Sequence, residues 1–167
     1  MDVLVVRHAD AGDPDRGRWP DDDQRPLSKM GTDEFRTIAR HLGSIVSEVD
    51  LVWASSLVRA RQTAEILSEE TGWPKQRRLP ALEPGGSAAS ILEALRSESE
   101  LGCIALVGHE PDLHELVAYL LTGETGALVE MKKGGAALLR FDGRVAPGRA
   151  SLAWLLPPRV LLGRRPR

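Results

Sequence analysis

Hydrophobic residues along the chain alternate between short continuous runs and longer stretches with helical spacing. Three continuous runs, Val3–Val6, Leu51–Ala54 and Cys103–Val107, are typical of strands buried on both faces. Between and after them, apolar positions recur every three or four residues, which is the period of a half-buried helix. This spacing predicts helices over Thr32–Leu42, Val58–Glu70, Ala88–Leu95 and Pro111 to about Leu121.

The remaining pattern completes this alternation. Ala136–Phe141 and Ser151–Leu156 are predicted to be late strands separated by glycine and proline turns. Residues 10–26 are polar and rich in glycine, proline and aspartate, which favours a solvated loop. Thr32 is the expected N-cap of the first helix, and Pro111 suits the first turn of the last one.

Strands that alternate with helices predict an α/β fold built as a three-layer sandwich. A mostly parallel central sheet is expected, with helices on both faces. No linker or internal repeat divides the chain, so a single domain is predicted over residues 1–162, followed by a basic tail at 163–167. Ligands of such sheets bind beyond the carboxyl ends of the strands, so site residues are expected directly after strands.

Composition limits the partners that this chain is expected to have. With a net charge of −2, one tyrosine and two phenylalanines, the 167-residue chain lacks the basic, aromatic surface typical of nucleic-acid binding. Its apolar runs are shorter than the ~20 residues of a membrane helix. Cys103 is the single cysteine and excludes an internal disulfide. We therefore expect a soluble, cytoplasmic protein without nucleic-acid or membrane partners.

Histidines and arginines follow three of the predicted strands. Arg7 and His8 come directly after the first strand, Arg59 opens the helix after the second, and His109 follows the third. Arginine matches phosphoryl oxygens bidentately and stays charged. A neutral imidazole can attack phosphorus, and a protonated one can stabilise the oxygens during transfer. The set indicates phosphoryl chemistry, and nothing in it requires a metal or another cofactor.

Four segments resemble the histidine phosphatase superfamily, which has the phosphoglycerate-mutase-like fold. The family's Arg-His-Gly appears as Arg7-His8-Ala9, and its Ser-Pro-Leu-x-Arg-Ala-x-Gln-Thr-Ala segment matches residues 55–64 except at Ser56. Residues 107–111 resemble its late Gly-His motif, and residues 25–31 resemble its turn into the first helix. Each motif is weak alone, but all four occur in the family's order over residues 3–121.

The resemblance implies roles for these residues. His8 would be the nucleophile, and Arg7, Arg59 and His109 would bind the phosphate. The short chain and the segment Leu82–Gly86 look like the SixA-type branch, which is associated with removing phosphate from phosphohistidine on signalling proteins. A phosphorylated protein is thus the expected substrate. A small phosphomonoester, or a non-catalytic module that only binds phosphate, remains the alternative.

Glu83 is a tentative general acid. An acidic residue protonates the leaving oxygen in many members of the superfamily, and Glu83 follows a plausible short strand at Arg78–Leu79. A glutamate beside a proline in a loop is more often simply solvated, and the SixA-type pattern does not require an acid there. His109 and His114 are not expected to form a zinc site, since they are five residues apart, a poor spacing for two ligands on a helix.

Overall fold

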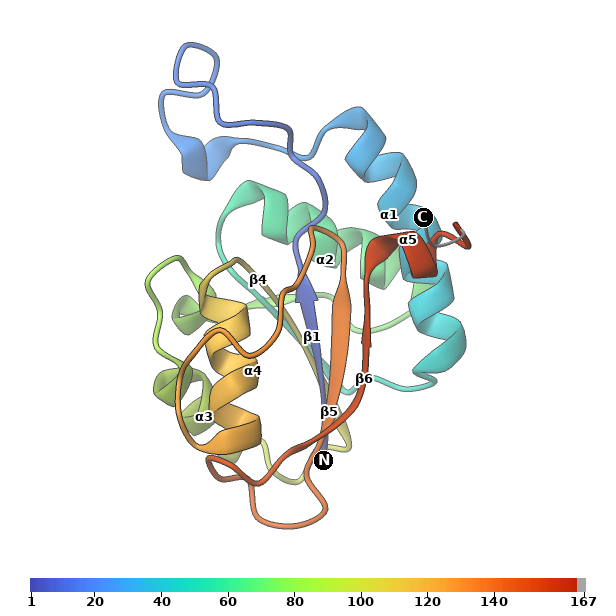
Figure 1. Cartoon of the computed structure of the whole chain (residues 1–167). Coiled ribbons are helices and arrows are strands. Elements are labelled where there is room, and N and C mark those ends of the chain that lie inside the picture. Colours follow the sequence, from blue (N-terminus) through green and yellow to red (C-terminus); the bar gives the residue numbers. More distant parts are fainter. Residues whose placement is uncertain (165–167) are drawn as a thin grey trace.

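A single six-stranded sheet organises the protein, and the computed structural model describes residues 1–164 (Figure 1). The strand order is β3-β2-β4-β1-β5-β6. Pairs β3–β2, β2–β4 and β4–β1 are parallel, whereas β1–β5 and β5–β6 are antiparallel. The mostly parallel sheet predicted from the sequence is confirmed. The strands are β1 (Asp2–Arg7), β2 (Leu51–Ala54), β3 (Arg77–Arg78), β4 (Cys103–Gly108), β5 (Ala136–Arg140) and β6 (Ser151–Leu156).

Helices cover both faces of this sheet, as Figure 1 shows. One face packs against α1 and α2, and the other packs against α3 and α4. The described helices are α1 (Lys29–Ile45), α2 (Val58–Thr71), α3 (Ala88–Ser97), α4 (Asp112–Thr122) and the short α5 (Pro158–Leu161), with 3₁₀ turns η1 (Asp22–Gln24) and η2 (Pro80–Leu82). None of the helices in residues 1–164 has the length and apolar character needed to cross a membrane.

The central strand β1 explains why its sequence is apolar without alternation. Leu4 and Val6 belong to the core beneath α1 and α2, whereas Val3 and Val5 belong to the core beneath α3 and α4. All four side chains are fully buried. Successive side chains of a strand point to opposite faces, so a strand covered on both sides has to be apolar at every position.

The start of the first helix differs from the prediction. Ser28, not Thr32, caps α1, because its side chain accepts a hydrogen bond from the backbone N–H of Gly31. Thr32 lies one turn inside the helix and donates its hydroxyl to the carbonyl of Ser28. Apolar periodicity begins only where the helix reaches the core, so it missed the exposed first turn. The structure also adds η1 inside the predicted loop.

The chain end is described as far as Arg164. Arg164 Nη2 lies 2.6 Å from Glu34 Oε1 of α1, so this first part of the predicted basic tail contacts the fold. The rest of the tail, residues 165–167, lies outside the described residues.

Gly31 allows the loop after β1 to lie tightly against α1. We therefore expect a side chain at this position to destabilise the fold. A Cβ at Gly31 would lie 2.0 Å from the carbonyl oxygen of Asp10, which accepts the backbone N–H of Ser28. Gly31→Ala should therefore destabilise the fold by about 1–3 kcal/mol, as overpacking does, although alanine favours helices by ~1 kcal/mol. Urea unfolding measures this. Gly126→Ala, whose Cβ meets nothing within 4 Å, is the control. Equal stabilities of the two variants would contradict the prediction.

Candidate active site

Two histidines meet where β1 and β4 end side by side. The parallel register pairs Arg7 with Gly108, and the backbone N–H of His8 donates to the carbonyl of Gly108 at 3.0 Å. The residues that follow, His8 and His109, therefore leave the sheet together. Their ring centroids are 5.1 Å apart, with ring planes at 52°.

A cavity of about 480 Å³ opens at this edge of the sheet. It brings together Arg7, His8, Arg59 and His109, four of the five site residues predicted from the sequence. The segment 10–26, which rises beyond the end of β1 in Figure 1, supplies much of the remaining wall. The other lining residues are Gly12, Asp13, Pro14, Asp22, Asp23, Arg25, Pro84, Glu110 and Lys133.

His8 is held in the form that a nucleophile needs. Its side chain is buried, with 6% of the residue exposed, and Nδ1 lies 2.7 Å from the carbonyl oxygen of Ala9. A carbonyl can only accept, so Nδ1 carries the proton and Nε2 keeps its lone pair. Burial lowers the pKa of His8 to about 4, aided by the charges of Arg59 and Arg7, although the bond to Ala9 opposes the shift. The ring is neutral at pH 7.

His109 is also neutral in the free site. Its Nε2 lies 2.9 Å from Ser55 Oγ at the end of β2, and only 3% of the residue is exposed. Burial, followed by the proximity of the His8 ring and of the charged Arg59, lowers its pKa to about 3. Its buried Nδ1 has no hydrogen-bond partner within residues 1–164. A bound anion would favour the protonated ring, because an opposite charge nearby raises a histidine's pKa.

Arg7 and Arg59 are two of the four cationic side chains that line the cavity. Arg7 donates from Nη1 to the carbonyl of Met131 at 2.8 Å. Arg59, the second residue of α2, donates from Nη1 to the carbonyl of Asp22 at 2.9 Å. The buried Nε atoms of both arginines have no partner in the described chain. Each guanidinium carries five N–H donors, so both retain capacity for phosphoryl oxygens.

The residues that follow Arg59 hold the site's loops in place. Thr63 Oγ1 accepts the backbone N–H of Ala9 at 3.0 Å and donates to the carbonyl of Arg59 at 2.7 Å. Gln62 Oε1 accepts the backbone N–H of Leu27 at 2.8 Å. One turn of α2 thus ties the segment that carries His8 to the segment that carries Arg25. This explains structurally why the motif of residues 55–64 extends beyond its arginine.

Six charged residues line the cavity without being predicted site residues: Asp13, Asp22, Asp23, Arg25, Glu110 and Lys133. Arg25 is buried, donates to the carbonyls of Ala11 and Gly12 at 3.0 and 2.9 Å, and pairs with Asp22. Its place in the segment 25–31, which resembles a family motif, is a sequence signal for a role in the site, although the motif by itself indicates only a turn. Asp22 belongs to the predicted loop 10–26, and Glu110 directly follows the predicted site residue His109. Lys133, which pairs with Asp10 at 2.9 Å, comes from the distant segment before β5, and no sequence pattern marked it.

Glu83 is not brought together with the other predicted site residues, a placement that argues against the role of general acid. It is absent from the residues that line the cavity, and its Oε1 lies 2.7 Å from Arg78 Nη2. Hydrogen bonds from Ser56 and Arg78 hold the pKa of Glu83 below its ordinary value. A general acid needs the opposite shift. The sequence placed Glu83 after a strand correctly, but β3 lies at the edge of the sheet, away from β1.

Glu110 is the carboxyl of the cavity whose pKa is raised, chiefly by burial. Its oxygens are nevertheless not free to face a substrate. Oε2 lies 2.7 Å from His114 Nδ1 and accepts the backbone N–H of His114 at 3.3 Å. Oε1 is buried without a partner in residues 1–164. Glu110, the lining carboxyl with the raised pKa, is thus held by His114, whereas Asp13 and Asp23 are exposed lining residues.

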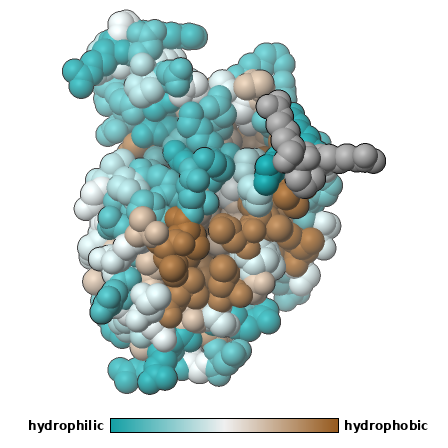
Figure 2. All heavy atoms as spheres, viewed as in Figure 1, coloured by the Kyte–Doolittle hydropathy of each residue, from teal (hydrophilic) through white to brown (hydrophobic). Residues whose placement is uncertain are grey.

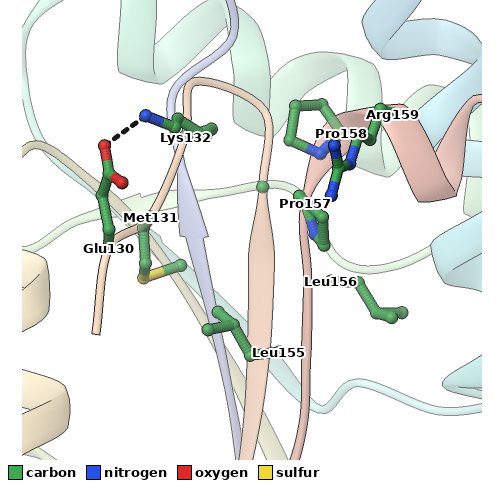
Figure 3. Close-up of a pocket in the computed structure, with 9 residues that line it drawn as sticks. Glu130, Met131, Lys132, Leu155, Leu156, Pro157, Pro158 and Arg159 are labelled. Carbon is green, nitrogen blue, oxygen red and sulfur yellow. Dashed lines mark hydrogen bonds and ion pairs between the residues drawn. The ribbon is translucent and has the colours of Figure 1, made fainter. Parts of the chain in front are cut away.

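A second cavity, of about 370 Å³, is more apolar and separate in its lining (Figure 3). It lies between the segment before β5 and the end of β6, and Met131, Leu155 and Leu156 are among its walls. Hydrophobic residues, brown in Figure 2, gather near the middle of the face shown there, whereas the 10–26 segment at the top is hydrophilic. None of the predicted catalytic residues lines this second cavity, so the chemistry belongs to the cavity of His8.

Comparison with known proteins agrees with this geometry. The family model of the histidine phosphatase superfamily (branch 1) matches residues 3–83. The chain is 34% identical over 142 residues to an uncharacterised protein of Picosynechococcus sp., covering 84% of this chain and 85% of that protein. It is 33% identical over 129 residues to the phosphohistidine phosphatase SixA of Escherichia coli, covering 75% and 77% of the two chains.

A solved structure of the protein histidine phosphatase SixA in complex with tungstate has the same fold. The TM-score is 0.84 at 27% identity, over 96% of this chain and 99% of that one. This match agrees with the order of the motifs and with the contact between His8 and His109. The chain belongs to the histidine phosphatase superfamily and is a SixA-type phosphatase.

Proposed function

We propose that this phosphatase removes the phosphoryl group from phosphohistidine on a protein, through a covalent intermediate on His8. The observation that carries this proposal is a neutral His8 with Nε2 free, beside two arginines, in a cavity where the carboxyl with the raised pKa, Glu110, is held by His114. The similarity to a phosphohistidine phosphatase supports the same substrate class.

The proposed reaction begins with the phosphoryl group between Arg7, Arg59 and His109. The lone pair of His8 Nε2 attacks phosphorus, a new N–P bond forms, and the N–P bond to the substrate ring breaks. If the substrate ring carries a proton on its other nitrogen, it departs as neutral histidine. The reaction then moves a phosphoryl group between two equivalent imidazoles, and no proton has to be delivered.

Water completes the cycle. Its oxygen bonds to phosphorus, the N–P bond to His8 breaks, and His8 regains its lone pair while one proton passes to solvent. The arginines stabilise the equatorial oxygens in both steps. The approaching dianion would raise the pKa of His109, which would take a proton from solvent and add a third positive charge, and Ser55 would hold its ring through Nε2.

The engagement of Glu110 by His114 bears on the substrate class. An alkoxide is strongly basic, so an alkyl phosphate needs a proton from a positioned acid, which typically contributes ~10²–10⁴-fold. A protonated imidazole needs none. Phosphohistidine therefore fits the described cavity better than alkyl phosphomonoesters do. A module that only binds phosphate would have no use for the free Nε2 of His8.

The covalent step is tested by trapping. During turnover of a phosphohistidine protein, alkali-stable and acid-labile phosphate should accumulate on His8. His8→Ala should lower turnover by about a thousandfold or more, because the nucleophile is lost. His41→Ala is the matched control, since His41 contacts Leu161 at the far end of α1 and does not line the cavity. Labelling of another residue, or full activity of His8→Ala, would refute the intermediate.

Ionisation of the two histidines gives a second prediction. Because the pKa values of His8 and His109 are lowered to about 4 and about 3, NMR titration of the free protein should find both rings neutral from pH 5 upward. Below pH 6.5 the histidines of the unfolded chain bind protons that the folded chain does not bind. The free energy of unfolding should therefore fall as the pH drops from 6.5 towards 4. Adding inorganic phosphate should raise both values. Rings that titrate near 6.5 in the free protein would contradict the site's description.

Metal independence is part of the proposal. Residues 1–164 contain no group of three or more histidine, cysteine, aspartate or glutamate side chains arranged to hold a metal ion, and Arg7 and Arg59 supply positive charge. Activity should therefore survive prolonged chelation followed by desalting, within about twofold of the untreated enzyme, since no resident ion takes part. Recovery that depends on adding a divalent cation would show that the arginines are not sufficient.

A further inference from the structure

The cavity of His8 is nearly balanced in charge, although it has to accept a dianion. Both histidines are neutral in the free site, so its charge comes from the other lining residues. Those are four cationic side chains and four acidic ones: Arg7, Arg25, Arg59 and Lys133 against Asp13, Asp22, Asp23 and Glu110. A phosphate pocket with no surplus positive charge disfavours any substrate that brings a second anionic group.

Asp22 is the acidic residue closest to the phosphate-binding arginine. Its Oδ2 lies 3.3 Å from Arg59 Nη1. The buried Arg25 also grips it, with Nε 2.7 Å from Oδ1 and Nη2 3.3 Å from Oδ2. The hydrogen bond from Arg25 holds the pKa of Asp22 below its ordinary value, so the carboxyl is charged at neutral pH. Its side chain is 45% exposed, which leaves part of the carboxylate open to the cavity.

The carboxylate of Asp22 remains charged beside a bound phosphoryl group, and this indicates which ligand it favours. When a phosphoryl group takes the free donors of Arg59, Arg25 still fixes Asp22 through both of its oxygens. A charged carboxylate then remains beside the group that carries the phosphate. An independent sign of an anionic ligand is His109, 3% exposed, which lines the same cavity and has no partner for Nδ1 within residues 1–164.

We propose that Asp22, flanked by the exposed Asp13 and Asp23, is a specificity-determining residue that selects phosphoryl groups on a cationic carrier, foremost the protonated ring of phosphohistidine. This inference rests on the proposed function and gives the physical basis of its substrate class. The transfer to His8 described above begins with a positive charge on the substrate ring. The carboxylate of Asp22 stabilises that charge on the substrate, while alkyl and aryl phosphates bring no positive charge for it to meet.

Two substrates that both leave without an acid isolate this effect. Phosphohistidine in an uncharged synthetic peptide has a cationic carrier, and p-nitrophenyl phosphate has a weakly basic, uncharged one. Asp22→Asn should lower the ratio of kcat/KM for the first substrate to that for the second by about fivefold, the size of a partly exposed charge interaction. The change should arise from a loss on phosphohistidine together with an unchanged or improved KM for p-nitrophenyl phosphate.

Asp21→Asn is the matched control. It removes the same charge one residue away, but Asp21 does not line the cavity, and its side chain caps η1, a role that asparagine also fills. The ratio should stay at the parent value in Asp21→Asn. High salt should shrink the effect of Asp22→Asn, because partly exposed charges are screened.

Several outcomes would overturn the inference. Equal losses on both substrates would mean that Asp22 only positions Arg25 and Arg59. An unchanged ratio, or the same change in Asp21→Asn, would mean that the carboxylate of Asp22 does not interact with the charge of the group that carries the phosphate. Should Asp22→Asn fail to fold, Asp23→Asn tests the rim, since Asp23 makes no ion pair within residues 1–164 and lines the cavity. Failure here leaves trapping on His8 intact, whereas failure of the proposed function abolishes trapping in the parent.

Discussion

The parallel pairing of β1 with β4 is the constraint on which the rest of the site depends. The register sets Arg7 against Gly108, so the next residue of each strand is a histidine that emerges at the same edge of the sheet. The bond from the backbone of His8 to Gly108 continues the ladder one residue past the strand. A slip of one residue would turn every side chain of β1 to the opposite face. The core thereby fixes the distance between the two rings.

Burial controls the chemistry of these rings as much as their position does. Withdrawal from water and the charges of Arg7 and Arg59 disfavour the imidazolium form of both histidines. The same environment therefore keeps His8 nucleophilic and prepares His109 to gain a proton when an anion arrives. Arginine tolerates this setting because it stays charged where histidine does not. The free site is thus uncharged at its histidines at neutral pH.

The segment between β1 and α1 gives a common fold its particular cavity. Hydrogen bonds from Thr63 and Gln62 attach its two ends to α2, and Arg25 folds its middle back onto the carbonyls of Ala11 and Gly12. These bonds place Asp22 against Arg59, so one segment supplies both a hydrogen-bond partner for Arg59 and an acidic wall of the cavity. Loops held on a rigid scaffold in this way are where related enzymes of one fold differ in function.

The sequence alone determined the order of elements and the identity of the central histidines and arginines. Continuous apolar runs marked β1, β2 and β4, because strands buried on both faces cannot alternate, and Arg7, His8 and His109 directly follow two of these runs. Tertiary structure decided the rest. Arg25 and Lys133 became cavity residues, and Glu83 did not, through contacts between segments far apart in the chain. Local periodicity reports which face of an element is buried, whereas the neighbours of a loop side chain depend on how distant segments pack.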